Sequence, residues 1–151
     1  MGREYGQGQT YFLALLAEAY GKVGQAEEGL VALAEALAVV HKMGGSGDEA
    51  ELYRLKGTLT LQSKVQSPRS KVEKEAEECF QKAIEIARRQ QAKSLELRAV
   101  MSLSRLWQKQ GKKEDARKLL AEIYGWFTEG FDTKDLQEAK ALLEELQPAG
   151  E

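Results

Sequence analysis

The chain has 151 residues, with 22 lysine and arginine residues against 24 aspartate and glutamate residues, and its formal net charge is −2. This balance argues against a general binder of nucleic acids or membrane surfaces, because such proteins depend on a large positive excess. The single cysteine, Cys79, excludes an internal disulfide, and together with the single histidine, His41, it leaves too few soft ligands for a structural zinc site. No apolar stretch approaches the roughly 20 residues of a transmembrane helix, so we expect a cytoplasmic protein. We also expect no cofactor and no metal.

The composition favours helices throughout the chain. It contains 19 Ala, 20 Leu, 20 Glu and 22 Lys and Arg residues, but only 7 Val, 3 Ile and 5 Thr residues. The first group are strong helix formers, whereas the β-branched residues of the second group are typical of strands. An all-α fold is therefore predicted, and the length is enough for one domain with a real core.

Apolar residues recur at helical steps of three and four, and breaks in this pattern divide the chain. In chain order, helices are expected at residues 10–22, about 26–43, about 48–63, 72–91, 94–109, 113–127 and 133–146. Gly24 and the glycines at 44–47 end the first two helices. A polar loop at 64–71 follows the third helix, because Pro68 disfavours a helical residue before it.

The ends of the elements carry their own signals. The polar run at 1–9 is expected to be a flexible N-terminal segment, or the edge of a fragment cut from a longer chain. Asp48 is an expected N-cap of the third helix, and Asp132 or Thr133 an expected N-cap of the last. Pro148 forbids continuation of that last helix.

Two stretches of the chain share one spacing of small, aromatic and glycine residues. The positions are Leu16, Ala17, Tyr20, Gly24, Gly29, Leu33 and Ala36 in the first stretch and Leu103, Ser104, Trp107, Gly111, Ala116, Leu120 and Ile123 in the second. A middle stretch fits the same template through Gly57, Ala76, Phe80 and Ala83, with extra residues around Pro68. Such an internal repeat is typical of stacked helix pairs.

These positions resemble the tetratricopeptide repeat, in which small residues sit where two helices touch, an aromatic fills the gap and a glycine makes the turn. The resemblance implies an antiparallel helix-pair solenoid over residues 10–127, with three repeats at about 10–43, 48–91 and 94–127. The middle repeat carries an insertion near 64–71, and a capping helix follows at 132–147. The sequence departs from the family pattern at Lys56, Thr60 and Ile123.

Two further segments, 92–99 and 124–132, resemble the C-terminal tetratricopeptide region of large bacterial signalling proteins. In those proteins a nucleotide cyclase or regulatory domain and an ATPase domain precede the repeats. The resemblance implies that the catalytic machinery lies outside this chain.

Candidate catalytic and ligand-binding residues have structural alternatives. The glycines near residue 6 and the Gly21-Lys22 pair fail as nucleotide-binding loops, because the following residues do not fit. His41 suits a helix C-terminus, and Cys79 is expected to be an inert, half-buried thiol. Trp107 falls at the aromatic packing position of the repeat. Trp126 either packs against the last helix or contributes to a contact surface. We therefore expect no enzyme.

In tetratricopeptide arrays the first helix of each pair lines a concave groove, and the resemblance assigns the positions that face it. These are Tyr11, Ala14, Glu18 and Lys22 in the first repeat, Glu51, Arg54, Thr58 and Leu61 in the second, and Arg98, Met101, Arg105, Gln108 and Lys109 in the third. The predicted peptide-binding residues are Arg54, Arg98, Met101, Arg105, Gln108 and Lys109. The arginine and lysine side chains among them form a basic patch suited to carboxylates. The alternative is a hydrated helix face with no particular ligand.

The predicted function is a non-catalytic scaffold that presents this groove to a protein or peptide with acidic groups, or to a neighbouring domain. One alternative is self-association as a homodimer through an uncovered apolar end, formed by Tyr5, Tyr11, Phe12 and Leu15. Another is a small-molecule-sensing domain. Nucleic acids and membranes are not expected partners.

Overall fold

The computed structural model describes residues 2–63 and 67–148, with the side chains described from residue 8 onward. Seven α-helices and no strands occupy these ranges, which confirms the predicted all-α class. The helices are α1 (Gly2–Lys22), α2 (Ala26–Met43), α3 (Glu49–Gln62), α4 (Arg69–Arg89), α5 (Lys93–Lys109), α6 (Lys113–Tyr124) and α7 (Lys134–Glu145).

Three helix ends differ from the sequence prediction by three residues or more. Helix α1 begins at Gly2, so residues 2–9, expected to form a flexible segment, continue this helix instead. Helix α4 begins at Arg69, directly after the extended N-cap residue Pro68, whose carbonyl accepts hydrogen bonds from the N–H groups of Lys71 and Val72. The predicted loop at 64–71 is therefore shorter, and its residues 64–66 lie outside the described residues. Helix α6 ends at Tyr124, three residues before the predicted 127.

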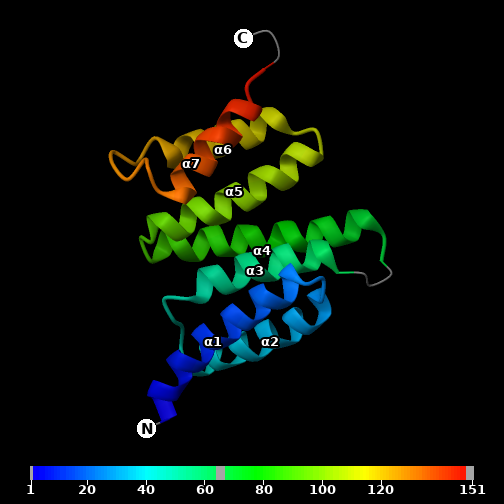
Figure 1. The fold of residues 1–151 in the computed structure, drawn as a ribbon, viewed down its shortest axis with the longest axis vertical. Helices are drawn as coiled ribbons and strands as arrows, with labels where there is room; N and C mark the ends of the chain where they lie inside the picture. Colours follow the sequence, from blue (N-terminus) through cyan, green and yellow to red (C-terminus); the bar gives the residue numbers. More distant parts are fainter. Residues whose placement is uncertain (1, 64–66, 149–151) are drawn as a thin grey trace.

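The helices form two layers (Figure 1). Helices α1, α3, α5 and α7 contact one another in succession, and their shared surface is called here the odd-helix face. Helices α2, α4 and α6 each pack on the helix before and the helix after, and within the described residues they do not contact one another. The chain thus advances by reversing helix pairs from the N-terminal to the C-terminal end (Figure 1).

The turns after α1, α4 and α5 have the same construction. In each turn a residue with positive φ follows the helix: Gly24 at 79°, Gln91 at 56° and Gly111 at 81°. The next N–H donates to a carbonyl five residues back, as in the 2.8 Å bond from Lys112 to Trp107. This left-handed closure satisfies helix C-terminal carbonyls, and it suits glycine because a Cβ is strained there.

Small residues permit the close approach of helices within pairs. A Cβ on Gly29 would lie 3.1 Å from the carbonyl oxygen of Ala17, and the hydroxyl of Ser104 donates to the carbonyl of Ala116 at 3.4 Å. These two contacts join positions that are equivalent in the sequence repeat. In the middle pair, a Cβ on Gly57 would lie 2.5 Å from the Phe80 ring. The ring therefore occupies the space that a side chain at position 57 would need.

Helix α7 closes the C-terminal end of the core. It buries Leu136, Ala139 and Leu142 against the cluster built by α4, α5 and α6, and its cap residue Leu146 is buried with them. Thr133 caps the helix by accepting a hydrogen bond from the Leu136 N–H, as predicted.

Asp48 occupies the N-cap position of α3, as predicted, but its side chain makes no capping hydrogen bond. Its backbone is helical, with φ −87° and ψ −6°, whereas a capping side chain needs an extended residue.

Among the described helices, none combines the length and apolar character that a membrane span requires.

Candidate functional site

The odd-helix face carries an apolar hollow of about 300 Å³ between α1, α3 and α5. Its apolar lining consists of Tyr11, Ala14, Leu15, Leu55 and Leu95, and its rim carries Glu18, Asp48, Glu51 and Arg98. Tyr11 and Leu15 are 61% and 48% exposed, although both are large apolar side chains. Exposed apolar surface in a concave position is typical of a binding site.

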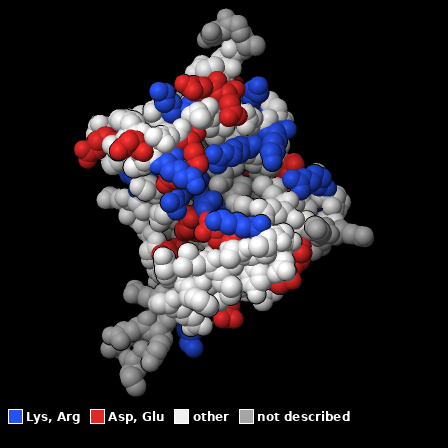
Figure 2. All heavy atoms as spheres, viewed as in Figure 1, with Lys and Arg blue, Asp and Glu red and all other residues white. Residues whose placement is uncertain are grey.

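A second, charged hollow of about 220 Å³ adjoins the first and extends to α7. It is lined by Arg54, Arg98, Met101, Ser102, Arg105 and Lys134, together with Glu18, Asp135 and Glu138. Glu18 and Arg98 line both hollows, so the two lie side by side. On the face seen in Figure 2, charges of both signs are interleaved above a mostly uncharged region over α1 and α2.

Four of the six predicted binding residues lie together in the charged hollow: Arg54, Arg98, Met101 and Arg105. Met101 is 3% exposed and forms part of its floor, so it offers little surface to a ligand. Gln108 and Lys109 line neither hollow. Gln108 instead donates a 3.2 Å hydrogen bond to Glu145 of α7.

The arginines of the predicted basic patch are already paired with carboxylates. Arg54 makes a bidentate contact with Glu51, at 2.9 and 2.7 Å. Arg98 lies 2.9 Å from Asp135 and 3.4 Å from Glu51. The hydrogen bond from Arg98 to Asp135 is the main reason why the pKa of this guanidinium is raised. Because carboxylates neutralise these guanidiniums, the structure does not present the free basic surface that the sequence predicted.

Glu51 of α3 supplies part of this neutralisation, and α7, which the sequence analysis treated only as a capping helix, supplies the rest. Asp135, Glu138 and Glu145 of α7 pair with Arg98, Arg105 and Gln108 of α5, the Arg105 contact being long at 3.9 Å. The acidic residues share a face of α7, because they are spaced by three and seven. This spacing was the signal in the sequence that α7 has an acidic face. Which residues that face meets is shown by the packing of α7 along α5.

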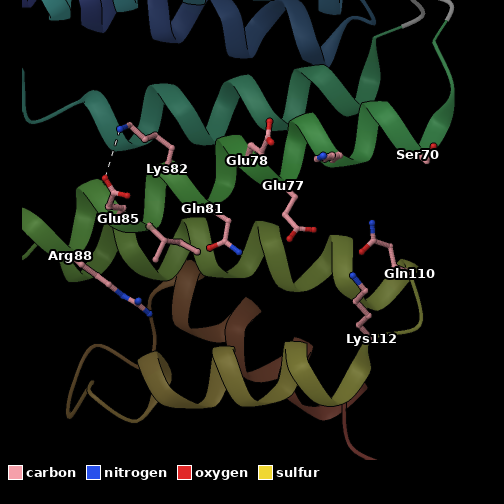
Figure 3. A pocket seen from close by; sticks show the side chains of 11 residues that line it. Ser70, Glu77, Glu78, Gln81, Lys82, Glu85, Arg88, Gln110 and Lys112 are labelled. Carbon is pink, nitrogen blue, oxygen red and sulfur yellow. Dashed lines mark ion pairs between the residues drawn. The ribbon is translucent and has the colours of Figure 1, made fainter.

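A third, outer hollow of about 840 Å³ lies along α4, on the side facing α5 and α6 (Figure 3). Figure 3 shows Glu77 and Gln81 pointing from α4 toward the later helices, with Gln110 and Lys112 at the turn between α5 and α6. Lysines and glutamates alternate around it, as in the Lys82–Glu85 ion pair at 3.7 Å. Its described lining is mixed in charge, with Ile84 as the one apolar residue, so it offers no distinct ligand chemistry.

The other residues singled out from the sequence lie apart from the odd-helix face. Cys79 is half-buried, and burial raises the pKa of its thiol, which disfavours the reactive thiolate. His41 is exposed at the end of α2, with its Nε2 3.4 Å from the Tyr53 hydroxyl. Trp107 is half-buried, and its indole N–H donates to Glu77 at 3.3 Å.

Trp126 is exposed on the segment between α6 and α7. Its ring meets that of Phe127 edge-on, with the centroids 5.1 Å apart, and the Lys93 ammonium lies 5.5 Å from its centroid. Its surroundings are a neighbouring aromatic residue and a cation, so it belongs to the surface more than to the core.

No group of three or more histidine, cysteine or acidic side chains that could hold a metal ion is found in the described ranges. Comparison of the sequence with protein-family models gives no match, and comparison with curated proteins gives none either. The case for function therefore depends on the geometry of the odd-helix face.

Proposed function

We propose that this chain is a non-catalytic interaction scaffold of the cytoplasm, in which the odd-helix face binds a peptide or an extended segment of another domain. The observation that carries the proposal is the pair of adjoining hollows over α1, α3, α5 and α7, with Tyr11 and Leu15 exposed at one end. A preformed hollow on rigid helices costs little ordering when a ligand enters it.

The proposed architecture is a solenoid of three tetratricopeptide-like repeats with a capping helix. Three features support it. The turns at Gly24 and Gly111 are alike, the Ala17–Gly29 and Ser104–Ala116 contacts fall at equivalent repeat positions, and odd and even helices form separate layers. A place within a larger bacterial signalling protein is part of the same proposal and depends on the resemblance of segments 92–99 and 124–132.

The binding proposal is tested by selecting peptides from a random display library on the immobilised protein and measuring their affinities. Ala14→Trp fills the apolar hollow, and Tyr11→Ala removes one wall at an exposed position. We expect both variants to weaken the selected peptides about tenfold or more. Gln81→Ala, in the outer hollow, is the matched control and should leave the affinities unchanged. If every selected peptide binds Ala14→Trp and Tyr11→Ala as it binds wild type, the odd-helix face is not the binding site.

A second candidate function is self-association, which a specific observation favours. Phe12 and Ala19 share one face of α1 at a step of seven, and Val23 follows in the turn directly after the helix. All three are exposed, Phe12 by 61% and Val23 by 70%. Of the end patch predicted from sequence, Tyr11 and Leu15 instead line the apolar hollow, and the side chain of Tyr5 lies outside the described residues.

Light scattering after size exclusion tests this candidate over a range of protein concentrations. A dimer formed through α1 should revert to monomer in Phe12→Glu, because a buried charge in an apolar interface is unfavourable. A monomeric wild type at every concentration, or a dimer unaffected by Phe12→Glu, would exclude association through this face.

A further inference from the structure

The rim of the apolar hollow is acidic. Glu18, Asp48 and Glu51 provide three carboxylates, whereas Arg98 provides the only guanidinium among the described lining residues. The apolar floor and these charges belong to the same hollow, so a ligand that fills the floor also meets the rim. The charge of the rim therefore helps to select the ligand.

Existing ion pairs show which of these charges remain uncompensated. Glu51 is satisfied by both Arg54 and Arg98, at 2.7 and 3.4 Å. Arg98 is in turn satisfied by Glu51 and by Asp135. Within the described part of the chain, neither Glu18 nor Asp48 forms an ion pair. The uncompensated charge beside the apolar floor is thus negative, and it comes from α1 and from the start of α3.

From this charge complementarity we infer that the apolar hollow selects a peptide with a large apolar side chain next to lysine or arginine. The apolar side chain would contact Ala14, Leu55 and Leu95, while the neighbouring cation would pair with Glu18 or Asp48. This inference rests on the proposed peptide-binding function and names its ligand class. It reverses the acidic preference expected from the sequence, because the arginines on which that expectation depended are already neutralised.

The test uses four short fluorescein-labelled peptides of equal length in a glycine-serine background. Three carry a central phenylalanine flanked on both sides by lysine, by glutamine or by glutamate, and the fourth carries lysines around a central alanine. Fluorescence anisotropy gives the dissociation constant of each. The lysine-phenylalanine peptide should bind about fivefold more tightly than the glutamine peptide, and more tightly still than the glutamate peptide. Exchange of phenylalanine for alanine should abolish most of the binding.

Two protein variants separate the contribution of the rim from that of the floor. In Glu18→Gln combined with Asp48→Asn, the preference for lysine over glutamine should disappear, while the affinity of the glutamine peptide stays the same. Glu85→Gln, in the outer hollow, removes one carboxylate elsewhere and should preserve the preference. Added salt should reduce the preference in wild type, because exposed charges are screened. Circular dichroism confirms that each variant keeps its helices.

The outcomes distinguish this inference from the proposed function. Equal binding of the lysine and glutamine peptides, or tighter binding of the glutamate peptide, with loss of affinity in Ala14→Trp, would overturn the basic preference and leave the peptide-binding face standing. Binding of all peptides that is insensitive to Ala14→Trp would overturn both. Failure of all four peptides to bind would overturn this inference alone, since the library selection decides the proposed function.

Discussion

The two ends of the helix array are built differently. At the C-terminal end, α7 covers the third helix pair and buries Leu136, Ala139 and Leu142, while its outward residues are polar or small. At the N-terminal end no described helix covers α1, and Phe12 and Val23 remain 61% and 70% exposed. Stacked helix pairs need such a cover, because each pair leaves one apolar face unburied. Within the described residues, a covering helix therefore closes the C-terminal end of this array and not the N-terminal end.

The cores behind these two ends differ as well. The N-terminal cluster, between α1, α2 and α3, has leucines, alanines and one valine as its described buried side chains. The C-terminal cluster, from α4 to α7, adds Phe80, Met101 and the isoleucines Ile84 and Ile123. The half-buried Tyr53 packs against both clusters. We therefore expect the C-terminal part to be the more stable part.

Substitution of one apolar side chain by alanine at each end of the array should give the largest contrast in the free energy of unfolding. Leu142→Ala should lower the free energy of unfolding by about 2–5 kcal/mol, because it removes a leucine that is 3% exposed and leaves a cavity. Val23→Ala at the open end should change it by about 0.5 kcal/mol or less. Urea unfolding followed by circular dichroism measures both. If Val23→Ala costs as much as Leu142→Ala, the N-terminal face is covered in solution, and the two ends are alike.

The sequence predicted the helices well where local signals decide their ends. Gly24 and Gly111 marked turns because a left-handed backbone favours glycine. The turn at Gln91 has the same form without a glycine, so it gave no comparable signal. The start of α1 was missed because its glycines and polar residues resemble a loop, although they continue the helix in the structure.

The candidate site was predictable in part for a similar reason. Helical spacing brought Tyr11, Ala14 and Glu18 to one face of α1, and the structure places all three around the apolar hollow. Spacing along one helix carries no information about the charges that a distant helix places opposite it. The neutralisation of Arg98 by Asp135 depends on how α7 packs along α5, which is a tertiary property.

The junction of the two core clusters provides the next prediction. Gly57→Ala would place a Cβ 2.5 Å from the buried Phe80 ring, and we expect a loss of about 1–3 kcal/mol in the free energy of unfolding. A second change, Phe80→Leu, should recover part of this loss in the double variant, because it removes the overlapping ring. Gly8→Ala is the control, since a Cβ there meets nothing within 4 Å. Equal stability of Gly57→Ala and Gly8→Ala would show that the helices separate without cost.

The turns allow the effect of one substitution on stability to be compared at the two ends. Gly24 and Gly111 have nearly the same φ, and each has open space around its Cβ position. Gly24→Ala and Gly111→Ala should each cost about 1–2 kcal/mol, the strain of a left-handed alanine. Gln91→Gly should instead gain up to about 1 kcal/mol, since it relieves that strain but adds freedom to the unfolded chain. Thermal unfolding measures all three. A loss in Gln91→Gly would mean that its side chain, and not its backbone, stabilises the turn.

The smallest expected effect concerns the ion pair that ties α7 to α5. Arg98 and Asp135 are 2.9 Å apart, but their side chains are 45% and 30% exposed, so solvent and salt weaken their attraction. A double-mutant cycle with Arg98→Gln and Asp135→Asn should give a coupling of about 0.2–1 kcal/mol that declines in high salt. A coupling several times larger would mean that α7 is held to the C-terminal end by charge. A coupling within this range would leave that role to its buried leucines, the kind of covering contact that the described chain does not supply for the open face of α1.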